Sequence, residues 1–134
     1  MKPQPEFWLG QTVRVVRPPS TEEWEDHYFN YGSEGRVGQE YVIDAIDYHE
    51  HNGDYYYSYS LKGSNWHLRR VLTLVGPSTP HQRIPFHKPI KVRNTSTPFI
   101  VEGCRVTIDG SITVIGNNLR IKASELMLHT TPIL

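Results

Sequence analysis

The sequence predicts an all-β protein. Its clearest element is a hairpin in which two β-rich runs, residues 41–51 and 54–61, flank Asn52-Gly53. Asn-Gly is the favoured pair for a two-residue type I′ turn, because both central residues need positive φ. The 134-residue chain also holds 10 Gly and 10 Pro, a composition typical of loop-rich β proteins.

The two-residue turn fixes the register of this hairpin, since it pairs His51 with Asp54. Side chains alternate between faces along a strand, so we expect one core face and one solvent face. The core face would hold Ile46, Tyr48, Tyr55, Tyr57 and Tyr59, and the solvent face Asp47, His49, His51, Asp54, Tyr56 and Ser58. Asp44 would fall on the core side opposite Leu61, so we expect a β-bulge at Asp44 or Ala45.

The chain before the hairpin is expected to hold a tail, one strand and an acidic insertion. Residues 1–9 are interpreted as a tail, with Phe7 and Trp8 packed against the domain, and residues 11–16 as a strand. Ser20 and Glu23 then match a capping box, which favours a short helix in the insertion. An irregular loop is the alternative.

The chain after the hairpin divides into three parts. Two more short strands are expected over residues 66–75, which complete one domain over residues 1–76. The four prolines of residues 77–89 predict an extended linker. Residues 90–134 are expected to form a second small β unit, with a bulged three-residue loop at Asp109-Gly110. That loop would place Val106 and Ile108 on one face with Ile112 and Val114.

The two β segments end alike. The sequence GSNWHL at 63–68 resembles GNNLRI at 116–121, and each is followed by two leucines in alternation. We interpret this as a weak tandem repeat of a β meander. A unit of about 40 residues is too small for an independent core, so the second unit is expected to pack on the first or on another subunit.

Charge and composition limit the classes of function. The chain has 14 basic and 14 acidic residues, so its net charge gives no general attraction to nucleic acid or membranes. Cys104 is the only cysteine, which excludes an intrachain disulfide, and we expect it to be buried. We expect no signal peptide, because the run MKPQPEFWLG has no apolar segment, and no stretch approaches the roughly 20 apolar residues that span a bilayer. We expect a soluble cytoplasmic protein.

The two halves nevertheless differ in charge. Residues 1–76 hold 7 Lys/Arg against 11 Asp/Glu, whereas residues 77–134 hold 7 against 3. The halves either attract each other, or the second half presents a basic face. The residues of such a face would be Lys88, Lys91, Arg93, Arg105, Arg120 and Lys122.

Three segments around the hairpin carry a resemblance. The runs GQTVRVVR, GSEGRVGQEYVI and GSNWHLRRVLTLV resemble the small SH3-like β-barrels of short phage and bacterial proteins. The resemblance covers about residues 10–75 and implies five short strands in a partly open barrel. It includes protein-docking, nucleic-acid-binding and structural members, so it leaves function open. The chain lacks the ALYDY-type run of eukaryotic peptide-binding SH3 domains, which argues against binding of proline-rich peptides.

No catalytic motif is present, and we expect neither an enzyme nor a cofactor. His49 and His51 share a strand face with Asp54, a possible start of a metal site, but no spaced His or Cys completes it. We therefore expect no metal there. Tyrosines 55–57 and 59 could stack on bases while Arg69 and Arg70 hold phosphates, although the neighbouring acids would repel a phosphate backbone.

We expect a non-enzymatic binding protein that docks on or inhibits another protein, of the phage or mobile-element type. Aromatic side chains on loops are typical interface anchors. The expected contact residues are Trp24, His27, Tyr28, Tyr31, His49 and Tyr56. One alternative is a nucleic-acid-binding protein that uses the basic second half. Another is an oligomer that sequesters a small molecule or nucleotide between its subunits.

Overall fold

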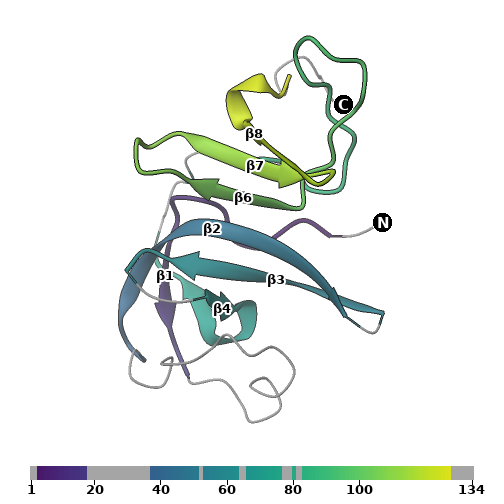
Figure 1. Cartoon of the computed structure of the whole chain (residues 1–134). Helices are drawn as coiled ribbons and strands as arrows, with labels where there is room; N and C mark the ends of the chain where they lie inside the picture. Colours follow the sequence, from purple (N-terminus) through teal and green to yellow (C-terminus); the bar gives the residue numbers. More distant parts are fainter. Residues whose placement is uncertain are drawn as a thin grey trace. The chain divides into compact units, whose positions relative to one another are not determined.

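The computed structural model describes most of the chain and divides it into two compact units (Figure 1). The described residues are 3–17, 37–51, 53–63, 66–76, 80 and 83–127. The N-terminal unit comprises Pro5–Arg83, and the C-terminal unit comprises Ile84–Leu134 together with Met1–Gln4. In these described ranges both units consist of antiparallel strands and 3-10 turns without an α-helix, so the all-β prediction is confirmed. The short helix expected after Ser20 lies outside them.

The described residues of the N-terminal unit form five strands and one 3-10 helix. They are β1 (Thr12–Val15), β2 (Glu40–His51), β3 (Asp54–Leu61), β4 (Trp66–Leu68), η2 (Arg69–Val71) and β5 (Leu72–Leu74). All neighbours are antiparallel, in the order β5-β1-β2-β3-β4. Among the residues described, no ladder joins β4 to β5, so the sheet is open.

The β2–β3 hairpin has the register that its turn predicts. His51 pairs with Asp54 and Ile46 pairs with Tyr59. Gly53 has φ 84°, as a type I′ turn requires. The register shifts between Ile43 and Ala45, which confirms the predicted β-bulge.

The core of the N-terminal unit follows strand alternation. Its fully buried side chains include Val13, Val15, Ile43, Ile46, Tyr59, Leu61 and Leu72. The chain before β1 joins this core and is not a tail, because Phe7 and Leu9 are buried. The Gly10 amide donates to the Ile43 carbonyl and the Ile43 amide donates to the Gln11 carbonyl, which fixes this segment along β2.

The C-terminal unit contains a three-stranded meander. It consists of β6 (Gly103–Val106), β7 (Ile112–Gly116), β8 (Leu119–Lys122) and the 3-10 helix η3 (Ala123–Glu125). Two single bridges, Ile90 with Phe99 and Val92 with Leu126, add the segment before the meander. Cys104 is buried in this unit, as expected.

The expected linker is folded in its second half. Ile84 and Phe86 are fully buried in the C-terminal unit. The side-chain amide of Gln4 donates to the Phe86 carbonyl at 2.8 Å and accepts from the Phe86 amide at 2.7 Å. These two hydrogen bonds attach Gln4 to the C-terminal unit, although Gln4 lies 82 positions before Phe86 in the sequence.

The loop between β6 and β7 is the predicted bulged hairpin loop. Val106 pairs with Ile112, the Thr107 amide donates to the Ser111 carbonyl, and Gly110 has φ 88°. Ile108 corrects the prediction, because it lies at the tip and is completely exposed rather than on the core face. The loop geometry explains this, since the three loop residues leave the strand alternation.

Gly116 marks a close approach of two backbone segments. A Cβ atom there would lie 1.9 Å from the Ile100 carbonyl oxygen. The next side chain, Asn117, donates to the Pro98 carbonyl and accepts from the Ile100 amide. The end of β7 is thereby held against residues 98–100.

Candidate functional site

The turn end of the β2–β3 hairpin is the candidate site, and residues 47–57 are called the distal hairpin. Among the described residues of the N-terminal unit, β1 pairs with residues 40–42 of the hairpin, and β4 pairs with residues 58–60. Beyond these positions, the described ladders of this unit pair β2 with β3 only. Figure 1 shows this end of the hairpin extending beyond β1 and β4.

One face of the distal hairpin carries His49 and Tyr56, two of the expected contact residues. Their rings are stacked, with centroids 4.9 Å apart and planes 17° apart. The His49 Nε2 atom is hydrogen-bonded to the Ser58 hydroxyl at 2.8 Å. Burial raises the pKa of Tyr56 above its ordinary value. The structure thus holds both rings in one fixed arrangement.

Ser58 departs from the prediction for this face. It was expected on the solvent side, but it is almost completely buried. Its hydroxyl is satisfied by His49, as a buried polar group requires. The face that carries His49 and Tyr56 is therefore exposed to solvent only toward the turn, where Asp54 is exposed.

The opposite face carries three tyrosines and one glutamate. Tyr48 lies 5.7 Å from Tyr57 and 6.3 Å from Tyr55, measured between ring centroids, and both pairs are tilted. Exposure increases toward the turn, from 8% for Tyr57 to 44% for Tyr55. The Tyr48 hydroxyl donates to the Glu50 carboxylate, and Glu50 pairs with Tyr55 across the ladder. Residues Tyr48, Glu50, Tyr55 and Tyr57 are called the tyrosine face.

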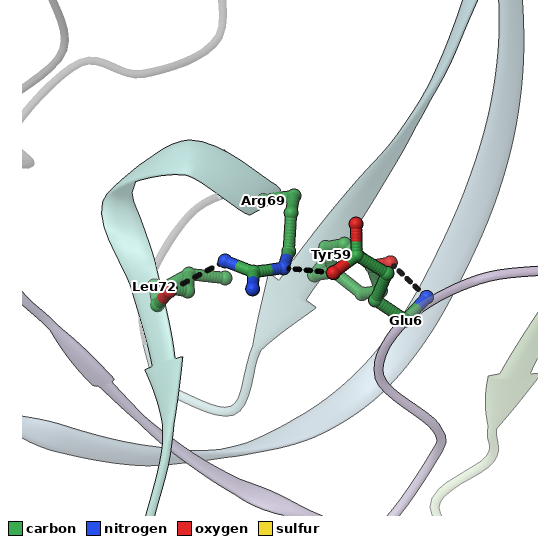
Figure 2. Close-up of polar contacts among 4 residues, drawn as sticks. All are labelled: Glu6, Tyr59, Arg69 and Leu72. Atoms are coloured by element: carbon green, nitrogen blue, oxygen red, sulfur yellow. Dashed lines mark hydrogen bonds and ion pairs between the residues drawn. The ribbon is translucent and has the colours of Figure 1, made fainter.

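A separate polar cluster ties the chain before β1 to the sheet (Figure 2). The Arg69 Nε atom lies 2.7 Å from Glu6 Oε2, and Nη1 donates to the Leu72 carbonyl at 3.0 Å. The Glu6 amide donates to the Tyr59 hydroxyl at 3.1 Å. The Arg69 guanidinium also lies over the Phe7 ring, 4.7 Å from its centroid. The Arg69 side chain is 43% exposed, but its guanidinium is already engaged by these three groups, which argues against its expected role as a phosphate ligand.

The electrostatics of Tyr59 fit a structural role. Burial, with a smaller contribution from the Glu6 carboxylate, raises the pKa of Tyr59 to about 12. Its phenol is thus neutral at physiological pH. It also packs edge-on against Phe7, with ring centroids 5.3 Å apart.

The six residues expected to form a basic face in the second half fall into two groups. Arg105, Thr113 and Lys122 are direct cross-strand partners in β6, β7 and β8, and Arg120 lies two residues from Lys122. These three basic residues therefore share one face of the meander, opposite the buried Cys104. Lys88, Lys91 and Arg93 are exposed on the segment that precedes the meander.

Several expectations fall outside the described residues. Trp24, His27, Tyr28 and Tyr31 belong to this group, so their placement is not part of the site. Within the described ranges, no group of three or more His, Cys, Asp or Glu side chains could hold a metal ion. No helix of this part of the chain has the length and apolar character needed to cross a bilayer.

Comparison with known proteins gives no relative. No protein-family model matches the chain, and no curated protein or solved structure matches it either. The function must therefore be inferred from the geometry.

Two features of the sites were not predicted from the sequence. The Glu6–Arg69 pair joins residues 63 positions apart, and no local pattern marks it. The Tyr48–Glu50 hydrogen bond has a weak signal, since residues two apart in a strand share a face.

Proposed function

We propose that this chain is a non-enzymatic binding protein that docks on or inhibits another protein through its distal hairpin. The observation that carries the proposal is the fixed presentation of aromatic side chains on a hairpin end that has only two strands within its unit. His49 and Tyr56 are stacked on one face, and Tyr55 is 44% exposed on the other. An accessory factor of phage or mobile-element type remains the expected biological setting.

Fixed aromatic side chains favour tight contacts for a physical reason. Tyrosine has a large amphipathic surface and few rotatable bonds, so ordering it at an interface costs little conformational entropy. Stacking of His49 on Tyr56, and the bond to Ser58, remove part of that cost before binding. The aromatic side chains of the distal hairpin are thus preorganised for binding.

The strand connections support the finer description of an SH3-like fold. The described strands β5-β1-β2-β3-β4 of the open sheet fit the five short strands in a partly open barrel that the resemblance implies. SH3-like folds serve many functions, so this similarity fits docking without requiring it.

The C-terminal unit supports a tandem repeat in the same way. Val92 bridges Leu126, as β1 pairs with β5, and Ile90 bridges Phe99, as β1 pairs with the start of β2. β6, β7 and β8 then correspond to the end of β2, to β3 and to β4, and η3 corresponds to η2. We infer two copies of one topology.

The proposal is tested on an identified partner. The purified chain is used to capture cross-linked proteins, which mass spectrometry identifies, and the affinity of each purified candidate is measured by calorimetry. His49→Ala and Tyr56→Ala should each weaken binding about tenfold or more, as expected for central contact residues. Tyr41→Ala is the matched control, since Tyr41 lies on β2 outside the distal hairpin.

One outcome would decide against docking through the distal hairpin, and a second variant tests the acidic insertion. Unchanged affinity of the His49 and Tyr56 variants, in proteins that unfold at the wild-type temperature, would remove the distal hairpin from the interface. The double variant Trp24→Ala and Tyr28→Ala tests the acidic insertion in the same assay, and unchanged affinity there would remove those residues.

A second candidate function is binding of nucleic acid by the C-terminal unit. The observation in its favour is the cross-strand row that places Arg105, Arg120 and Lys122 on one face of the meander. Binding to a labelled oligonucleotide should then fall steeply with salt, and Arg120→Ala should lower the slope of log affinity against log salt by about 1. Binding that does not depend on salt would rule this function out.

A further inference from the structure

The β2–β3 hairpin carries negatively charged side chains without basic ones. Residues 40–61 contain five carboxylates and no lysine or arginine. Glu40, at the far end from the turn, forms an ion pair with Arg14 at 2.6 Å. The other acids, Asp44, Asp47, Glu50 and Asp54, lie along the hairpin toward the turn. Their charge complements a basic partner.

The tyrosine face adds aromatic rings to this charge. The exposed ring of Tyr55 is the ladder partner of Glu50, and the Glu50 carboxylate accepts a hydrogen bond from Tyr48. Tyr48 in turn lies 6.3 Å from Tyr55, with the ring planes 37° apart. One carboxylate and two tilted rings therefore occupy one patch.

This combination selects among the chemical groups of a partner. A ring face attracts a cation, and a carboxylate beside it attracts the same cation. The arginine guanidinium satisfies both, because its plane stacks on a ring while its fork of N–H groups bonds to the carboxylate. A lysine ammonium is a more strongly hydrated point charge, and an acidic side chain would be repelled.

We propose that the tyrosine face receives an arginine side chain from a basic segment of the partner protein, with the guanidinium on the rings of Tyr48 and Tyr55 and against the carboxylate of Glu50. This inference rests on the proposed function, since it names the chemistry of the protein that docks there. It assigns a different face of the hairpin from the one that carries His49 and Tyr56.

The test uses defined peptides and the full chain. Fluorescent peptides of alternating glycine with arginine, lysine or glutamate are titrated at low and at physiological salt, and binding is followed by anisotropy. We expect the arginine peptide to bind several-fold more tightly than the lysine peptide, and the glutamate peptide not to bind.

Matched variants locate the contact. Glu50→Gln and Tyr55→Ala should each weaken binding of the arginine peptide about three- to tenfold, whereas Tyr55→Phe keeps the ring and most of the affinity. Asp54→Asn is the control, because it removes one carboxylate from the opposite face of the same hairpin. Circular dichroism confirms that each variant is folded.

Four results would overturn the inference. Equal affinity for arginine and lysine peptides, or equal losses from Glu50→Gln and Asp54→Asn, would indicate diffuse attraction by the acidic hairpin. No binding of the arginine peptide would exclude the contact altogether. Self-association that light scattering detects and Glu50→Gln abolishes would make a second copy of the chain the occupant.

These outcomes are separate from those of the proposed function. Loss of partner affinity in the His49 and Tyr56 variants, without any arginine preference, would leave docking intact and exclude only the guanidinium contact.

Discussion

The guanidinium of Arg69 contacts three groups from different parts of the N-terminal unit. It forms an ion pair with Glu6, donates to the Leu72 carbonyl and lies over the Phe7 ring. The ion pair alone contributes little, because both side chains are substantially exposed and water screens their charges. The planar fork of arginine is what allows the three contacts together.

Arg69→Lys should therefore lower the free energy of unfolding by about 1 kcal/mol, because lysine keeps the charge but cannot make the paired contacts. Glu6→Gln should change it by less than about 0.5 kcal/mol, since it removes only the exposed ion pair. Urea unfolding of both variants measures the difference. A larger loss for Glu6→Gln than for Arg69→Lys would contradict this account.

Tyr59 gives the unit a sensitivity to alkali. Burial raises its pKa from an ordinary 10.0 to about 12, so the phenol loses its proton more readily in the unfolded chain. The stabilising effect is complete below pH 10 and is lost as the pH rises toward the folded-state pKa. Urea unfolding at a series of pH values should show stability falling across this window.

The variant Tyr59→Phe separates this effect from general alkaline unfolding. It should start about 1 kcal/mol less stable, because the Glu6 amide loses its acceptor. Its stability should then fall less steeply above pH 10, with a residual decline from Tyr57, whose pKa burial also raises. An unchanged slope would show that Tyr59 does not titrate as described.

At the scale of elements, the sequence was informative where the signal is local. The hairpin register, the positive φ of Gly53 and the bulge beside Asp44 follow from alternation and turn chemistry, and all three agree with the structure. The bulged loop at Gly110 does too. Each depends only on residues a few positions apart.

Features that depend on distant chain segments were not predictable in this way. Burial of Ser58 and of Phe86, and the clamp between Gln4 and Phe86, arise from packing between segments that no periodicity connects. Of the candidate site, the sequence predicted the His49 and Tyr56 pair on one face. The hydrogen bond between Tyr48 and Glu50 depends on the direction of the Tyr48 hydroxyl, and the alternation of residues along a strand does not predict that direction.

The end of β7 provides a test of close packing between elements. Gly116→Ala should cost about 2–4 kcal/mol, because the new methyl group would collide with the Ile100 carbonyl, a backbone atom that cannot rotate away. Gly53→Ala is the comparison, since that turn has open space and only the strain of positive φ, worth about 1 kcal/mol. Equal costs in thermal unfolding would contradict the close approach.

At the scale of the whole molecule, each unit has a core of its own. The N-terminal core centres on Val13, Ile43 and Tyr59, and the C-terminal core on Phe86 and Val114. A unit with its own core can unfold by itself, so a substitution that destabilises one unit is expected to leave the stability of the other nearly unchanged.

Hydrogen exchange measures this separation. Gly116→Ala should speed the exchange of amides in β6, β7 and β8, and should leave the protection of β2 and β3 nearly unchanged. A uniform loss of protection throughout the described strands would show that the two units unfold as one.

The pairing of first and last strands also sets the order in which the protein can fold during synthesis. β1 pairs with β5, so the pairing of Val15 with Leu72 cannot form until Leu72 has left the ribosome. The bridge between Val92 and Leu126 likewise cannot form until Leu126 has been synthesised. Pairings this distant in sequence slow folding, and they leave a strand edge open to other nascent chains in the meantime. The local β2–β3 hairpin, which needs no distant segment, is the natural place for folding to begin.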